Sequence, residues 1–144
     1  MATKMLHFLL AEDDDDHAVL VLRSLKRNRV GNSVDRVPDG EEAVKYLLHE
    51  PPYQDKPRPD VLLLDLNMPK LSGHEVLVKI KADESLRCIP VVILTTSDAE
   101  ADRHKAYNLH ANSYLVKPID FTQFSKIVEE SSLYWGVWNR PAEG

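Results

Sequence analysis

The stretch from Asp60 to Pro69 constrains the fold of this chain more than any other. It reads DVLLLDLNMP, so a short apolar run is bounded by two aspartates. Such a run favours a strand over a helix, and an unbroken apolar strand is typical of a parallel sheet buried on both faces. The strand ends at Asp65, and the chain turns at Asn67 and Met68-Pro69. Open α/β sheets bind ligands beyond the carboxyl ends of their strands, so Asp65 occupies a position suited to a ligand site.

Strand-like and helix-like segments alternate along the whole chain. Strands are predicted at 6–11, 33–37, 61–64, 89–94 and 113–116. Helices are predicted from the acidic run to about Arg29, and from the capping residues Asp39, Ser72, Ser97 and Asp120. This alternation implies parallel strands joined by right-handed crossovers, with helices on both faces of the sheet. The predicted fold class is therefore a doubly wound α/β fold.

The helix predicted from Asp39 leads into a proline-rich segment. Its apolar residues are Ala43, Val44, Leu47 and Leu48, which would form one buried face. Residues 50–59 carry four prolines, which predict an exposed, extended loop.

Composition narrows the setting. A chain of 144 residues is expected to form one domain and to bury about two-thirds of its surface. Its net charge of −5 disfavours binding to nucleic acid. The single cysteine, Cys88, excludes an internal disulfide, so we expect the protein to work in a reducing compartment. We expect its side chain to be a small buried hydrophobic group. No signal-like segment opens the chain, and no apolar run approaches ~18 residues, so the predicted protein is cytoplasmic and makes no membrane contact.

The predicted strand ends bring together residues suited to phosphoryl transfer. They carry Glu12 and Asp13, Asp65, Thr95 and Lys117. Three carboxylates in one crevice repel one another unless a cation offsets their charge, and Mg²⁺ prefers such hard oxygen ligands. A threonine hydroxyl and a lysine ammonium could then contact phosphoryl oxygens. The set favours transfer of a phosphoryl group onto Asp65 with Mg²⁺ as cofactor.

These motifs resemble those of two-component response-regulator receiver domains. The matching residues, in the same order and at similar spacing, are Glu12-Asp13, Asp65 with Met68-Pro69, Thr95, Tyr114 and Lys117-Pro118. The resemblance covers about residues 6 to 130. It implies a flavodoxin-like receiver fold, a five-stranded parallel sheet of order 2-1-3-4-5. It also implies a single receiver domain over residues 1–144, with a helical and aromatic C-terminal tail at about 131–144.

The resemblance implies a metal site and a phosphoacceptor. Asp65 would be the phosphoacceptor and would bind Mg²⁺ directly, together with Asp13. Glu12 would bind the ion through water, and Asn67 would offer its backbone carbonyl.

The resemblance also implies a switch. Thr95 would bond the phosphoryl group, Tyr114 would swing inward behind it, and Lys117 would pair with a phosphoryl oxygen. The neighbouring acids Asp14, Asp15 and Asp16 are expected to be solvated or to begin the first helix.

A narrower resemblance is to the stand-alone receivers that partner cyanobacterial phytochromes. It is carried by the Pro-rich segment before Arg58-Pro59-Asp60, by Thr95-Thr96-Ser97, by residues 109–114 and by the aromatic tail. It implies a sensor histidine kinase of the phytochrome type as partner, an unidentified downstream protein, and signalling through changed protein contacts without an attached output domain. Slow self-dephosphorylation would be the limit of any catalysis.

The tail Leu133–Trp138 holds both tryptophans and has two interpretations. It could pack on its own domain, or it could form a contact surface, since aromatic residues are enriched at interface cores. We expect a two-fold homodimer built on the face of the fourth helix, fifth strand and fifth helix.

Two other functions are weaker alternatives. A Mg²⁺-dependent aspartyl-phosphate hydrolase of the haloacid-dehalogenase type would need a second Asp two residues after Asp65, where this chain has Asn67. A nucleotide-binding module would need a glycine-rich phosphate loop, and none of the usual patterns occurs in the sequence.

Overall fold

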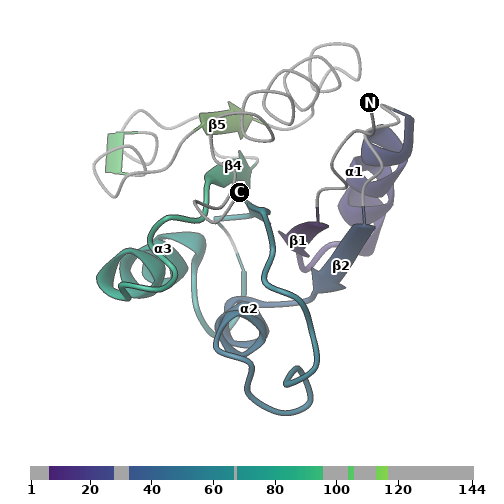
Figure 1. The fold of residues 1–144 in the computed structure, drawn as a ribbon. Coiled ribbons are helices and arrows are strands. Elements are labelled where there is room, and N and C mark those ends of the chain that lie inside the picture. The colour runs from purple at the N-terminus through teal and green to yellow at the C-terminus, as the bar shows by residue number, and fades with distance from the viewer. Residues whose placement is uncertain (1–6, 28–32, 67, 96–103, 106–112, 117–144) are drawn as a thin grey trace, which may run out of the picture.

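The fold is a five-stranded parallel sheet with helices on both of its faces (Figure 1). The computed structural model describes residues 7–27, 33–66, 68–95, 104–105 and 113–116. The strands are β1 (His7–Ala11), β2 (Ser33–Val37), β3 (Val61–Leu64), β4 (Val91–Thr95) and β5 (Ser113–Val116). Their order is β2-β1-β3-β4-β5, and every pairing is parallel. The predicted doubly wound order is therefore confirmed.

Successive residues of the central strands point to opposite faces of the sheet, and each face has its own hydrophobic core. Leu9 of β1 and Leu62 of β3 belong to one core, and Phe8 and Leu63 belong to the other. All residues of β1 and β3 are buried, as the apolar runs predict. Full burial of one such side chain contributes about 1.5–3 kcal/mol. These two strands, together with the equally buried residues 91–94 of β4, therefore supply much of the cohesion of the sheet.

The described helices divide between the two faces of the sheet. They are α1 (Asp15–Arg27), α2 (Gly40–Leu47) and α3 (Gly73–Ala82). The core under α2 and α3 is separate from the core that receives Ala18 and Val21 of α1, and Figure 1 shows α1 apart from the other two helices. The fourth and fifth predicted helices and the tail at 131–144 lie outside the described residues.

Side-chain caps begin α2 and α3. Ser72 accepts a hydrogen bond from the backbone N–H of Glu75 at 3.2 Å, and the Glu75 carboxylate accepts one from the Ser72 N–H at 2.9 Å. The capping box predicted for α3 is thus confirmed, and the bond from the Ser72 backbone holds the pKa of Glu75 below its usual value. At α2, Asp39 accepts from the Glu42 N–H at 2.8 Å, but the Glu42 carboxylate accepts instead from the Tyr53 hydroxyl at 2.6 Å.

The segment after α2 is less extended than predicted. Pro51 and Pro52 are exposed, but the chain turns there, Pro59 is buried, and Tyr53 packs on the core beside Tyr46. Leu48, predicted to face inward, is exposed because it is the C-cap residue at which α2 ends. Tyr46, which the prediction left out of the buried face, is 1% exposed.

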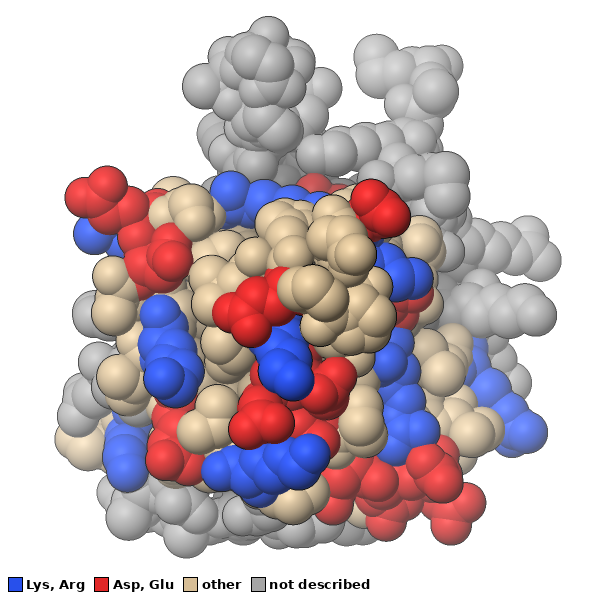
Figure 2. All heavy atoms as spheres, turned by 90° about the horizontal axis from the view of Figure 1, so that it is seen from below, with Lys and Arg blue, Asp and Glu red and all other residues tan. Residues whose placement is uncertain are grey.

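Two surface features bear on the predictions made from composition. Cys88 is exposed, because it lies in the turns between α3 and β4, and the prediction of a buried thiol was wrong. Acidic and basic side chains are interspersed on the face shown in Figure 2, so that face has no continuous basic field of the kind that binds nucleic acid. No helix in the described part of the chain is long and apolar enough to cross a membrane.

A buried polar network ties α2 to the amino ends of β1 and β2. The Tyr46 hydroxyl donates to Asp35 Oδ2 at 2.5 Å and lies 2.6 Å from Nε2 of His7. The other ring nitrogen of His7 lies 3.1 Å from Ser33 Oγ. Burial of Tyr46, together with its bond to Asp35, raises the pKa of its phenol far above the ordinary value. The hydroxyl is therefore a neutral donor at any ordinary pH.

Tyr46→Phe removes this hydroxyl and leaves the buried His7 nitrogen without it. We expect the free energy of unfolding to fall by about 1–3 kcal/mol, the cost of an unsatisfied buried polar group. Urea unfolding followed by circular dichroism measures the change. Tyr53→Phe is the matched control and should cost less, because Tyr53 is only half-buried. Equal unfolding free energies for Tyr46→Phe and the unaltered chain would contradict the role of the network.

Candidate metal-binding and phosphoacceptor site

Three carboxylates meet at the carboxyl ends of β1 and β3. These strands are paired in parallel with Ala11 opposite Leu64, so the next residues, Glu12 and Asp65, leave the sheet side by side. Glu12, Asp13 and Asp65 each offer one carboxylate oxygen, and these oxygens lie within 4.8 Å of one another. Glu12 is 0% exposed and Asp65 is 5% exposed, whereas Asp13 is open to solvent. The group therefore has a buried floor and a solvent-accessible side.

The charges of this group favour a divalent cation. At the separation of the buried pair Glu12 and Asp65, two unit charges repel by roughly 3 kcal/mol if the effective dielectric constant is about 20. A cation bound between the carboxylates turns this repulsion into attraction. Hard carboxylate oxygens that leave part of the coordination sphere open suit Mg²⁺, which keeps several water ligands. The donor set thus fits the metal predicted from the sequence.

Backbone hydrogen bonds hold the two buried acids in place. The ladder continues past the strand ends, because Glu12 N–H donates to the Val37 carbonyl at 3.1 Å and Asp65 N–H donates to the Ala11 carbonyl at 3.0 Å. One oxygen of Glu12 also accepts from the Asp14 N–H at 3.2 Å. The acids are therefore extensions of the sheet rather than members of a loose loop.

The following acids begin α1, as predicted. Asp14 accepts from the His17 N–H at 3.0 Å, and its carbonyl accepts from the Ala18 N–H at 3.0 Å. Asp15 and Asp16 lie in the first helical turn, where carboxylates stabilise the positive end of the helix dipole. These exposed acids are accounted for by helix geometry.

The remaining predicted site residues are described only in part. Thr95 is the last residue of β4, which pairs with β3, so its backbone lies at the same edge of the sheet as Asp65. Tyr114 lies in β5 opposite Ile93. The structure places the backbone of these two residues but not their side chains. Asn67 and Lys117 lie outside the described residues.

Gly73 supports Asp65, and the sequence analysis missed it. A Cβ atom on Gly73 would lie 2.6 Å from the Asp65 carbonyl oxygen and 2.7 Å from the Leu66 Cα. The Gly73 N–H donates to the Leu66 carbonyl at 2.9 Å. The start of α3 therefore packs directly on the backbone that carries Asp65. A glycine at the first helical position after the Ser72 cap was the available signal, but glycine is common near helix ends.

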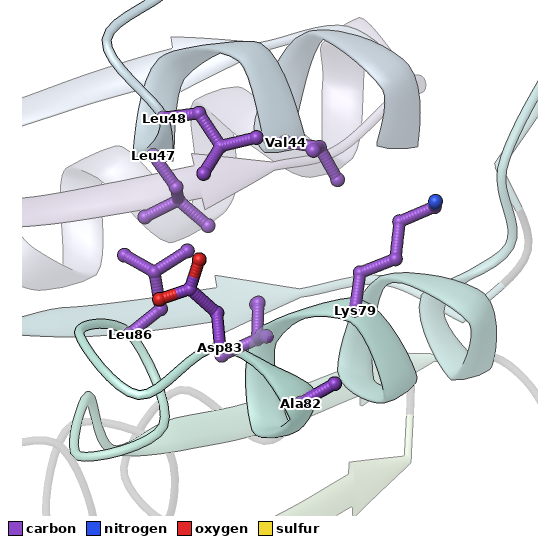
Figure 3. Close-up of a pocket in the computed structure, with 8 residues that line it drawn as sticks. Val44, Leu47, Leu48, Lys79, Ala82, Asp83 and Leu86 are labelled. Atoms are coloured by element: carbon purple, nitrogen blue, oxygen red, sulfur yellow. The ribbon is translucent and has the colours of Figure 1, made fainter.

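A groove of about 350 Å³ lies elsewhere, between α2 and α3 (Figure 3). Apolar side chains from both helices and from Leu86 line it, with Lys79 toward the Val44 end and Asp83 beside Leu86. None of the three clustered carboxylates is among its lining residues. The groove is thus distinct from the acidic site.

The fold and the acidic site together define the class of this protein. The family model of the response regulator receiver domain matches residues 8–129, and the chain belongs to that family. The resemblance found in the sequence is thereby confirmed.

Individual relatives extend over most of the chain. It is 47% identical over 133 residues to the probable methanogenesis regulatory protein FilR2 of Methanothrix harundinacea, covering 92% of this chain and 84% of the relative. It is 39% identical over 127 residues to the response regulator Rcp1 of Synechocystis, covering 88% and 86%.

Two solved structures match the fold closely. The phosphorylated cyanobacterial phytochrome response regulator RcpA superposes with a TM-score of 0.83 at 38% identity, covering 96% of this chain and 98% of that one. The Mn²⁺-bound form of Rcp1 superposes with a TM-score of 0.82 at 38% identity, covering 95% and 99%. The similarity to phytochrome response regulators is thus present in both sequence and structure.

Gly73→Ala tests the support under Asp65. The added methyl group meets backbone atoms that cannot rotate away, so we expect the free energy of unfolding to fall by about 1–3 kcal/mol, as for other overpacked sites. Urea unfolding measures it. Glu84→Ala, at an exposed position, is the control and should stay within about 0.5 kcal/mol of the unaltered chain. Full stability of Gly73→Ala would show that α3 shifts freely relative to Asp65.

Proposed function

We propose that this chain is a phosphorylation-controlled signalling switch that accepts a phosphoryl group on Asp65 from a sensor histidine kinase. The observation that carries the proposal is the nearly buried Asp65 carboxylate at the end of β3, with the carboxylates of Glu12 and Asp13 beside it. Mg²⁺ would be held by Asp13 and Asp65 directly, by Glu12 through water, and by the Asn67 backbone carbonyl.

The chemical step is transfer between two nucleophiles. A carboxylate oxygen of Asp65 forms a bond to phosphorus, the bond from phosphorus to the imidazole nitrogen of the kinase histidine breaks, and its electron pair returns to the imidazole. Mg²⁺, when bound, neutralises negative charge that develops on the phosphoryl oxygens. The ladder bonds to Asp65 and Glu12 keep both carboxylates in place, so little reorganisation accompanies transfer. Lys117 would pair with one phosphoryl oxygen from the loop after β5.

Phosphorylation would change the structure at and beyond the carboxyl ends of β4 and β5. Thr95 would bond the phosphoryl group, and Tyr114 would move inward behind it, which changes the surface offered to other proteins. The backbone of Thr95 ends β4 at the correct edge of the sheet for this role. Water would slowly hydrolyse the aspartyl phosphate, so the protein would reset itself without turning over an outside substrate.

The relatives support both the metal and the kinase class. RcpA is named as phosphorylated, and Rcp1 was solved with Mn²⁺, an ion of similar ligand preference to Mg²⁺. RcpA is named as a cyanobacterial phytochrome response regulator, which favours a phytochrome-type sensor as the donor for this chain. The similarity to FilR2 favours a second candidate donor, a histidine kinase of methanogenesis regulation.

Incubation with acetyl phosphate and Mg²⁺ tests the phosphoacceptor. We expect the intact mass to rise by one phosphoryl group, and the rise to be lost in Asp65→Asn and kept in Asp16→Asn, an exposed acid in α1. Labelling that survives Asp65→Asn would refute the assignment.

Phosphotransfer from purified kinases of the two candidate types then distinguishes the donors, because a cognate kinase should phosphorylate this chain much faster than the other kinase does.

We also propose a two-fold homodimer that uses the face of the fourth helix, β5 and the fifth helix, extended by the aromatic tail. Phosphorylation should tighten or reshape it, because Thr95 and Tyr114 would border that face. Sedimentation velocity of the full chain, of a version ending at Glu130 and of the phosphorylated chain tests this proposal. Asp65→Asn treated with acetyl phosphate is the control and should not respond. Monomers in all samples at micromolar concentration would mean that the tail packs on its own domain.

A further inference from the structure

Arg36 reaches from β2 to the backbone beside the metal-binding acids. In the sheet it lies opposite Leu10, two residues before Glu12. Its Nε donates to the Glu12 carbonyl oxygen at 2.9 Å, and its Nη2 donates to the same oxygen at 2.7 Å. Its Nη1 donates to Asp15 Oδ1 at 2.6 Å. The planar guanidinium therefore bridges the acceptor at the end of β1 and the first turn of α1.

The bonded carbonyl belongs to the peptide that joins Glu12 to Asp13. The Glu12 N–H, on the other side of that residue, is already bonded to the Val37 carbonyl. Residue 12 is thus tied to β2 through both its N–H and its carbonyl, and the direction in which Asp13 leaves the sheet follows from this arrangement. Fixing the backbone of one residue costs about 1–2 kcal/mol of conformational entropy. The hydrogen bonds to β2 contribute to this ordering of residue 12.

The charge of Arg36 and its hydrogen bonds have opposite effects on the binding of a cation. A guanidinium close to a cation site repels the cation, although its bond to the exposed Asp15 offsets part of that charge. A residue that mattered only through charge would therefore weaken cation binding, and its removal would strengthen it. A residue that fixed the ligands would strengthen cation binding, and its removal would weaken it. The two roles predict changes of opposite sign.

We propose that Arg36 is a positioning residue that fixes the Glu12–Asp13 peptide, so that both carboxylates converge with Asp65 on a divalent cation. The inference rests on the metal site of the proposed function. Arg36 would act through the ligands rather than by contact with the phosphoryl group or the ion. The geometric role outweighs the unfavourable charge, since the residues that orient metal ligands typically change metal affinity by about 10–100-fold.

Isothermal titration of the full chain with MgCl₂ at constant ionic strength tests the proposal. Arg36→Met keeps most of the side-chain length but removes the donors and the charge, and we expect Mg²⁺ to bind about tenfold more weakly. Arg36→Lys keeps the charge but offers a point donor in place of the planar guanidinium. Its affinity for Mg²⁺ should therefore lie between that of Arg36→Met and that of the unaltered chain. Asp13→Ala gives the reference for loss of a ligand. Arg58→Met is the matched control, because Arg58 precedes β3 at the opposite end of the strands from Asp65, and its affinity should be unchanged.

Each outcome either supports or overturns the inference. Tighter binding by Arg36→Met would show that Arg36 acts through charge, and unchanged binding would show that it has no influence on the site; either result overturns the inference. Absence of Mg²⁺ binding by the unaltered chain would overturn the proposed metal site itself, and this inference with it. Unfolding in the presence of EDTA confirms that each variant is folded. If Arg36→Met is not folded, Arg36→Lys with its unaltered charge decides the question, because only a positioning role predicts weaker binding by that variant.

Discussion

The parallel pairing of β1 with β3, with Ala11 opposite Leu64, is the constraint on which the rest of the structure depends. It brings Glu12 and Asp65 to the same edge of the sheet, although more than fifty residues separate them in the chain. Two buried carboxylates at this distance repel each other, and the apolar strands beneath them supply the cohesion that holds them together. The site is therefore an electrostatically unfavourable extension of two fully buried strands, and cation binding would relieve the repulsion.

Supports from three directions maintain this arrangement. The ladder bonds to Val37 and Ala11 hold the backbones of Glu12 and Asp65. The start of α3 lies against the Asp65 carbonyl, where Gly73 leaves no room for a side chain. Arg36 ties the peptide that precedes Asp13 to the edge strand. Each support acts on backbone atoms and so fixes the positions from which the three carboxylates converge.

The opposite end of the sheet is built in a different way. There a network of neutral and charged side chains joins Tyr46, His7 and Asp35, and Tyr53 covers it with a hydroxyl bonded to Glu42. Burial and the bond to Glu42 raise the pKa of Tyr53 to about 12, so this phenol also stays neutral. This end stabilises the fold by pairing buried donors with acceptors, whereas the acidic end gathers three carboxylates. The two ends of the sheet therefore differ in the chemistry of their side chains.

Sequence alone determined the strands, the helix starts at Asp39 and Ser72, and the acids that gather at the strand ends, because apolar runs and side-chain caps are local signals. Only the tertiary structure decided the partners of Arg36 and Tyr46, the close approach at Gly73, the exposure of Cys88 and the inward turn of Tyr53. Those features depend on which residues meet across strands far apart in the chain. A one-residue change of register would redirect every such contact while leaving the local pattern the same.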